Sequence, residues 1–175
     1  HLESLRAFLG LWVEKTGLPV LLCPEVRSEV AVMKEKVFDL LPPPVRERCV
    51  CMDHFWTTDQ ARTVYRLSRL VTSMEMHSVI LALASMTPVL HPCFPEAGIK
   101  ASMLRELGLG DWLSDVDHVT PYELFHAAQG IHLGHEAARG RVREAMKRVR
   151  ATSDEALALF SSLLRIGFPG GARPG

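Results

Sequence analysis

A glutamate and a histidine lie within the most apolar part of this sequence. The stretch TSMEMHSVILALASMTPVL (72–90) is typical of a buried strand, a tight polar turn, a helix and a second buried strand, and the turn holds Glu75 and His77. A helix that begins directly after a strand has free backbone N–H groups with a positive partial charge, which bind phosphate or carboxylate. An imidazole in its first turn can donate a hydrogen bond to such an anion or exchange a proton with a hydroxyl group. The pattern predicts an anion-binding turn with acid–base chemistry, and we expect both residues to be catalytic.

Four more polar residues are expected to bind the substrate near this turn. Ser73 and Ser78 provide hydroxyl groups on either side of it. His91 belongs to the loop 91–100, and Lys100 begins the next helix, from which it can reach a bound anion as a point charge.

Each of these residues also has an ordinary structural interpretation. His77 can be a solvated residue at a helix start, Glu75 can stabilise the helix dipole, and Lys100 can be a solvated lysine. His132 and His135 share a helix face, but no third ligand is evident, so the sequence does not predict a zinc site.

Short apolar runs alternate with helical patterns along most of the chain. Strands are predicted at 18–24, 48–52, 69–73 and 87–91, with an edge strand near 112–113, and helices at 2–15, 28–41, 57–67, 77–86 and 99–107. This alternation predicts an α/β fold with a Rossmann-like parallel sheet and helices on both faces. Ligands of such sheets bind beyond the carboxyl ends of the strands. The candidate positions are therefore the loop 24–27, the turn 73–77 with Glu75 and His77, and the loop 91–100.

A helical tail follows the α/β part. Thr120-Pro121-Tyr122-Glu123 is a capping box with proline at the first helical position, and the helical pattern runs to about residue 165. We expect breaks near 130–134 and 151–153. The sequence therefore predicts one domain, 1–168, and a disordered tail, 169–175.

The composition excludes several classes of protein. Net charge is zero, Lys and Arg are spread through the chain, and aromatic residues are few, so nucleic acid is not an expected partner. No apolar run reaches the roughly 20 residues that span a bilayer. The sequence also lacks the glycine-rich dinucleotide motif, the phosphate-binding P-loop and the serine hydrolase motif.

Four cysteines are present without a C-x-x-C pair. We interpret them as reduced thiols of a cytoplasmic protein, with a disulfide or a metal site as the alternative.

The stretch SRLVTSMEMHSVILALASMTPVLHP…IKASMLRELGLGDWL resembles the polysaccharide pyruvyl transferase family. The C-terminal lobe of that family has a strand ending in a Ser-x-Arg-x-His turn, a helix of small residues, a "tPvv" strand, a loop with a lysine and a helix ending in "lgl". The counterparts here are Ser73, Glu75 and His77; Ala82 and Ala84; Thr87-Pro88-Val89; Lys100; and Leu107-Gly108-Leu109. The resemblance covers residues 1 to about 150, and 68–113 is its specific part.

The resemblance implies one lobe of a GT-B-like enzyme, with the active site between two Rossmann-like lobes. Such enzymes transfer a pyruvyl group from phosphoenolpyruvate to sugar hydroxyls of polysaccharides, with no cofactor besides this donor substrate. His77 would contact the donor or act as a general acid, and Lys100 would add positive charge. Glu75 replaces the family's arginine and would repel the anionic donor. It would therefore turn away, pair with a cation such as Lys100, or mark a different donor or acceptor, and it could also bind sugar hydroxyls or act as a base.

Two other functions remain open. The chain could be the nucleotide-sugar lobe of a GT-B glycosyltransferase, with Glu96 as the acid for a ribose, or a non-catalytic lobe that binds carbohydrate or a partner. It starts at His1 within a helical pattern, so we expect a piece of a longer protein whose N-terminal lobe is missing. The face exposed by the missing lobe would favour a homo-oligomer.

Overall fold

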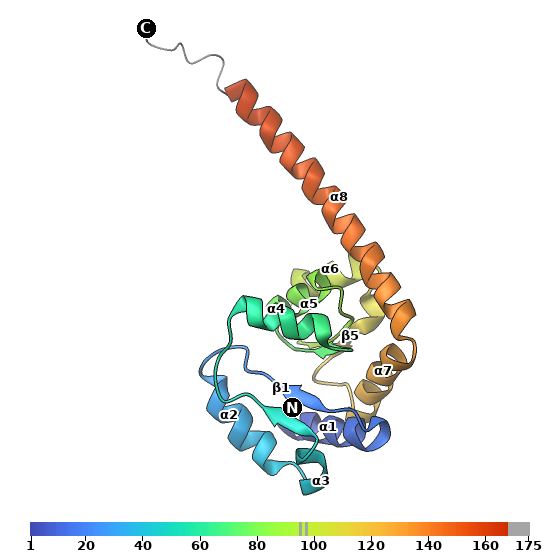
Figure 1. Cartoon of the computed structure of the whole chain (residues 1–175). Helices are drawn as coiled ribbons and strands as arrows, with labels where there is room; N and C mark the ends of the chain where they lie inside the picture. Colours follow the sequence, from blue (N-terminus) through green and yellow to red (C-terminus); the bar gives the residue numbers. More distant parts are fainter. Residues whose placement is uncertain (95, 97, 168–175) are drawn as a thin grey trace.

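The protein has an α/β fold with parallel strands (Figure 1). The computed structural model describes residues 1–94, 96 and 98–167, without the side chains of 99–101 and 165–167. The strands are β1 (Val20–Leu22), β2 (Cys49–Cys51), β3 (Val71–Thr72), β4 (Val89–Cys93) and β5 (Leu113–Asp115). All of them were predicted, although each is shorter than or shifted from its expected range. The predicted disordered tail, 169–175, lies outside the described residues.

Apart from α3, which was not predicted, the helices lie where the sequence predicts them, with differences at their ends. They are α1 (Leu2–Thr16), α2 (Glu29–Lys36), α3 (Pro43–Arg46), α4 (Thr58–Leu67), α5 (Met76–Ala84), α6 (Ile99–Glu106), α7 (Pro121–Leu133) and α8 (His135–Gly167), with 3₁₀ turns η1 (Phe38–Leu40) and η3 (Gly110–Trp112). Thr57 and Thr120 both close capping boxes, at the starts of α4 and α7. Gly17 and Gly108 follow the ends of α1 and α6 with φ of 67° and 76°, a backbone region that favours glycine.

The single sheet expected from the sequence is divided in two. β1 pairs with β2, and β3, β4 and β5 form a second sheet, with every pair parallel. A joined sheet would have the order 2-1-3-4-5, which is a common doubly wound order. The prediction of one sheet was therefore wrong at the β1–β3 junction. Pro19 precedes β1 and has no N–H to donate, and β3 has only two residues, so few backbone bonds are available to join these edges.

The core is centred on β4 and on the helices that cover it. All five residues of β4 are buried, and α5 packs against it through an apolar face that includes Val79 and Leu83. Leu104 of α6 and Val142 of α8 are fully buried in the same core. The second sheet is therefore fixed by the packing of its central strand, and the turn between β3 and α5 lies at its carboxyl end.

The segment after β1 differs from its predicted form. Ser28 precedes α2 but makes no capping bond through its side chain, and instead the Glu29 carboxylate accepts from the N–H groups of Glu25 and Val26. The helix predicted at 28–41 is shorter, since α2 ends at Lys36. A separate short helix, α3, begins with Pro43, because proline suits the first turn of a helix.

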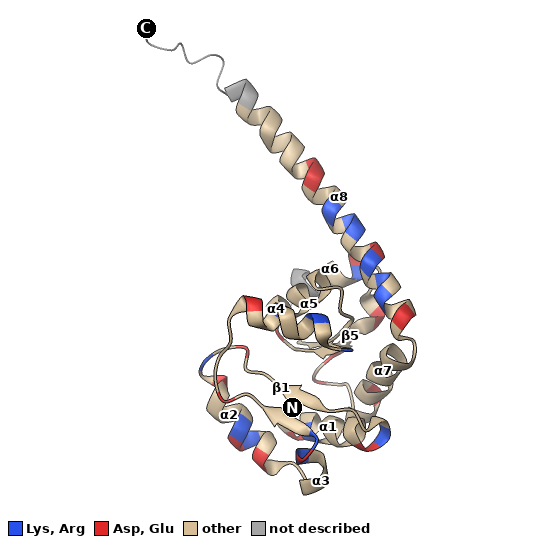
Figure 2. Ribbon diagram, viewed as in Figure 1, with Lys and Arg blue, Asp and Glu red and all other residues tan. Residues whose placement is uncertain are grey.

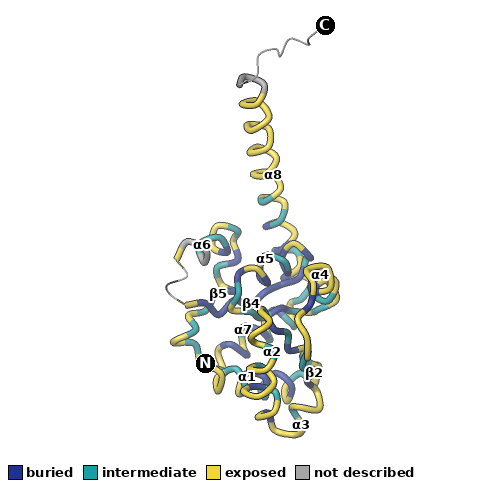
Figure 3. Tube along the Cα trace, turned by 90° about the vertical axis from the view of Figure 1, so that its left-hand side faces the viewer, coloured by how far each residue is buried: buried dark blue, intermediate teal, exposed yellow. Residues whose placement is uncertain are grey.

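α8 is one continuous helix, and its second half projects from the body of the protein (Figures 1 and 3). The break predicted near 151–153 is absent, since Ser153 donates its hydroxyl to the carbonyl of Val149 at 2.9 Å and stays helical. The break predicted near 130–134 is present, because α7 ends at Gly134. Across the part of the chain that the structure describes, every helix is too short or too polar to cross a bilayer.

Candidate functional site

The two sheets meet at their carboxyl ends through Glu25. Glu25 follows β1 and is partly buried, and its carboxylate accepts hydrogen bonds from the hydroxyls of Ser73, at 2.8 Å, and Ser78, at 2.6 Å. Ser73 directly follows β3, while Ser78 lies in the first turn of α5. Side chains therefore make the connection that the backbone does not make between β1 and β3.

Tyr65 of α4 extends this network into the core. The single hydroxyl proton of Ser78 goes to Glu25, so the Tyr65 hydroxyl donates to Ser78 Oγ, 2.7 Å away. Burial raises the pKa of Tyr65 to about 12, and the negative charge of Glu25 acts in the same direction. Burial also raises the pKa of the nearby Cys23 thiol to about 12, and the negative charge of Glu25 adds to this increase. Both groups are therefore protonated at neutral pH.

Glu75 and His77 form a pair at the start of α5. Glu75 is the N-cap residue, and its carboxylate accepts from the backbone N–H of His77 at 3.4 Å and lies 2.6 Å from His77 Nδ1. An ionised carboxylate can only accept, so Nδ1 carries the proton and Nε2 remains to act on a ligand. The His77 side chain is 88% exposed. The expected free helix N-terminus is therefore partly taken by the Glu75 carboxylate.

His91 lies behind the turn instead of in the following loop. It is the central residue of β4 and only 1% exposed, and its Nδ1 donates to the carbonyl oxygen of Ser73 at 2.7 Å. His91 therefore supports the backbone of the turn from the core. The predicted contact of His91 with a ligand stays a prediction. The side chain of Lys100 lies outside the described part of the structure, although its backbone is in the first turn of α6.

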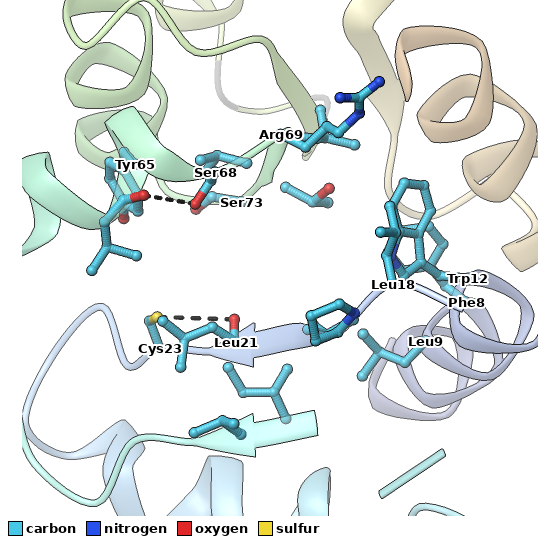
Figure 4. A pocket seen from close by; sticks show the side chains of 18 of the residues that line it. Phe8, Leu9, Trp12, Leu18, Leu21, Cys23, Tyr65, Ser68, Arg69 and Ser73 are labelled. Carbon is cyan, nitrogen blue, oxygen red and sulfur yellow. Dashed lines mark hydrogen bonds between the residues drawn. The ribbon is translucent and has the colours of Figure 1, made fainter. Parts of the chain in front are cut away.

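A cleft of about 670 Å³ lies between the two sheets and ends at this network (Figure 4). Its walls come from β1 and β3 and from α1 and α4, and they are mainly apolar, with Phe8, Trp12 and Leu18 among them. Glu25 and Ser73 lie at the carboxyl end of the strands, and Arg69 precedes β3 at the other end. The cleft has the size and apolar lining of many small-molecule sites.

Arg69 is held by the turn between α7 and α8. Its Nε donates to His132 Nδ1 at 2.8 Å, and one terminal nitrogen donates to the His132 carbonyl at 3.2 Å. Burial and the nearby Arg69 charge lower the pKa of His132 and of His135. Within the described residues, no cluster of three or more His, Cys, Asp or Glu side chains could hold a metal ion, and the four cysteines are not joined in disulfides.

Two other histidine–carboxylate pairs lie at the carboxyl ends of strands. His54 Nδ1 is 2.7 Å from Asp53 after β2, and His118 Nδ1 is 2.9 Å from Asp115 at the end of β5. The Asp115 carboxylate raises the pKa of His118. The Glu75–His77 pair differs from both because it caps a helix and adjoins the Ser73–Glu25 network.

The structure brings together most of the residues expected from the sequence. Ser73, Glu75, His77 and Ser78 lie in one turn, with His91 behind it. Glu25 was not named as a site residue, although it lies in the loop 24–27, which was expected at the ligand-binding edge because it directly follows an apolar strand of a parallel sheet.

Comparison of the chain with models of known protein families, with curated proteins and with solved structures found no match. The chemistry of the site must therefore be argued from its own geometry. This geometry provides an oriented, exposed imidazole, two carboxylates and the remaining N–H groups of a helix N-terminus.

Proposed function

We propose that this chain is one lobe of a GT-B-like transferase that moves a pyruvyl group from phosphoenolpyruvate to a sugar hydroxyl of a polysaccharide. The observation that carries the proposal is the Glu75–His77 pair. Its two groups are 2.6 Å apart, and the imidazole is exposed at the carboxyl end of a parallel sheet. The resemblance of residues 68–113 to the pyruvyl transferase family supports the choice of donor and acceptor.

His77 acts as the general acid in this proposal. The oxygens of two sugar hydroxyls form bonds to the central carbon of the donor, and the bond from this carbon to the phosphate oxygen breaks. Of the two hydroxyl protons, one goes to the methylene carbon, which becomes a methyl group, and the other leaves with inorganic phosphate. The Glu75 carboxylate fixes the tautomer and orientation of His77, so that Nε2 exchanges the proton. The serines at 73 and 78 position Glu25 and the turn, since their hydroxyl protons already go to the Glu25 carboxylate.

The negative charge of the site must be offset for an anionic donor to bind. The hydroxyl dipoles of Ser73 and Ser78, which donate to the Glu25 carboxylate, partly offset its repulsion of an anion. The N–H groups of the first turn of α5 that Glu75 does not take attract the donor phosphate or carboxylate. Lys100 and a second lobe would supply the remaining positive charge. The transferase would work in the cytoplasm, where its cysteines stay reduced.

Binding of phosphoenolpyruvate, measured by calorimetry, tests the donor. We expect saturable binding that His77→Gln weakens strongly. His118→Gln is the matched control, because it removes a similar exposed imidazole paired with Asp115 and should leave binding unchanged. Absence of binding, or equal loss in both variants, would contradict the donor assignment. Binding of a nucleotide sugar instead would favour the glycosyltransferase lobe.

Glu75→Arg gives a second test, because it restores the arginine of the family. Replacing a negative by a positive charge beside a bound anion should tighten donor binding by about tenfold, an effect that falls with added salt. The same change removes the carboxylate that orients His77, so turnover of the enzyme with both lobes should fall. Unchanged affinity would mean that position 75 does not face the donor.

A carbohydrate-binding lobe without catalysis is the second candidate. One observation favours it, since two carboxylates, Glu25 and Glu75, lie at the turn and are natural acceptors for sugar hydroxyls. This function predicts that oligosaccharides bind to the chain, that phosphoenolpyruvate does not, and that Glu75→Gln weakens the binding of the sugar.

A further inference from the structure

The second half of α8 presents an apolar surface that no described part of the chain covers. The first half of the helix is anchored to the body, because Ala138, Val142 and Ala145 are buried there. From residue 151 to 164 every residue is exposed (Figure 3). We call this segment, 151–164, the α8 tip.

The large apolar side chains of the α8 tip share one face of the helix. At 3.6 residues per turn, they form with Ala156 a stripe about half of the circumference wide, and Ala158 lies on the opposite face. The stripe comprises Ala156, Leu157, Leu159, Phe160, Leu163 and Leu164. Phe160 is 59% exposed and Leu157 is 62% exposed. A stripe of this kind is the usual contact face of a helix that packs against another helix.

We propose that the α8 tips of two copies of this chain pack against each other as an antiparallel helix pair centred near Phe160. The proposal does not depend on the function of the turn at α5. In this register, position 157 lies opposite 163 and position 156 opposite 164. The small Ala156 therefore faces the larger Leu164, which allows close packing across the twofold axis.

The charges along α8 favour the antiparallel direction. Glu155 borders the apolar stripe at the edge formed by Leu159. A parallel pair would place Glu155 of one copy beside Glu155 of the other, whereas the antiparallel register separates these two acids by about 15 Å along the helix.

The anchored half of α8 adds to this preference. It is rich in positive charge (Figure 2), with basic residues at Arg139, Arg141, Arg143, Lys147, Arg148 and Arg150. A parallel pair would bring these residues and the two protein bodies together. In the antiparallel pair, Ala145 is about 22 Å along the helix from Phe160 in each copy, so the bodies stand about 45 Å apart. The projecting half of the helix is therefore long enough to keep the bodies from colliding.

The contact area is sufficient for a weak dimer. Five large apolar side chains, each exposing on the order of 100 Å², give about 500 Å² a copy and about 1,000 Å² in total, at the lower limit of specific interfaces. Affinity does not follow from area alone, but this size is typical of reversible association. We therefore expect a dissociation constant in the micromolar range.

Sedimentation equilibrium from low to high micromolar concentrations tests the proposal. The wild-type chain should change from monomer to dimer, and Phe160→Glu should weaken the dimer at least tenfold. Ala158→Glu is the matched control, because it adds the same charge two residues away on the opposite face of the helix, where residue 158 is exposed, and should dimerise like the wild type. Circular dichroism checks that both variants keep the helix content of the wild type.

Cysteine cross-linking tests the direction of the two helices. In the antiparallel register position 157 of one copy faces position 163 of the other, so a mixture of Leu157→Cys and Leu163→Cys should oxidise mainly to the mixed disulfide, which peptide mass spectrometry identifies. A parallel pair would instead link each variant to its own copy. That result would overturn the antiparallel register.

Three results would overturn the dimer itself. These are a wild-type chain that stays monomeric at the highest concentration, a dimer that Phe160→Glu does not weaken, and a monomer that binds vesicles of phosphatidylcholine and phosphatidylserine. The last result would assign the α8 tip to a lipid surface.

Discussion

Removing the Glu25 carboxylate is expected to destabilise the junction between the two sheets. In Glu25→Ala, Ser73 and Ser78 lose charged acceptors at 2.8 and 2.6 Å. A hydrogen bond to a charged group contributes about 1.5–3 kcal/mol, so two give at most about 3–6 kcal/mol. The loss is smaller here, because Ser73 also lies 3.3 Å from the Glu75 carbonyl and Ser78 can turn to donate to Tyr65.

We therefore expect a net loss of about 2 kcal/mol in the free energy of unfolding. For a chain of this size, that corresponds to a fall of about 4–8 °C in the melting temperature. Thermal unfolding followed by circular dichroism measures it, with Glu35→Ala as the control, which removes an acid from an exposed position on α2. Surface substitutions of that kind usually change stability by less than about 0.5 kcal/mol. If Glu25→Ala and Glu35→Ala have the same melting temperature, the hydrogen bonds of Glu25 between the sheets do not contribute to stability.

Three further predictions concern the anchor of α8, a turn and a thiol. Arg141→Leu should lower the free energy of unfolding by about 1–2 kcal/mol in denaturant titrations, since Arg141 pairs with Asp111 and its guanidinium lies 4.7 Å from the Trp112 ring centre. Arg141 lowers the pKa of Asp111, so the pair stabilises the fold fully at pH values above the ordinary aspartate pKa of 3.8. The loss of stability in Asp111→Asn should therefore disappear as the pH falls through the lowered pKa of Asp111. Gly108→Ala should cost about 1 kcal/mol of stability because φ is 76° at this position, and an unchanged urea midpoint would contradict it. Cys23, whose pKa burial raises to about 12, should react with a disulfide reagent far more slowly than in the unfolded chain, as measured by mass spectrometry, and Glu25→Gln should speed the reaction by removing a charge that raises the pKa.

Local patterns allowed the elements of the fold to be predicted, while the division of the sheet was not predicted. Strands and helices follow the spacing of apolar residues, which the sequence contains directly. The division between β1 and β3 depends on two strands that are far apart in the sequence and on whether the backbone groups at their edges meet. Pro19 was the visible sign, because it removes a donor from the edge of β1.

The candidate site was predicted in part for the same reason. The turn from Ser73 to His77 is contiguous, so its residue types and its place after a strand were readable. The role of Glu25 depends on the packing of β1 beside β3, which brings it to Ser78, 53 residues away. His91 was expected at the boundary between a strand and the following loop, but it is the central residue of β4, where its bond to the Ser73 carbonyl satisfies the buried ring.

The projecting half of α8 also changes how the protein moves through solution. From Ala145 to Leu164 the helix extends about 28 Å, whereas a compact chain of 175 residues has a radius of gyration of about 16 Å. Viscous drag on this rod makes the particle diffuse and tumble like a heavier sphere. A single chain of 19.5 kDa is therefore expected to leave a gel-filtration column early, at the volume of a larger compact protein, while light scattering reports its true mass.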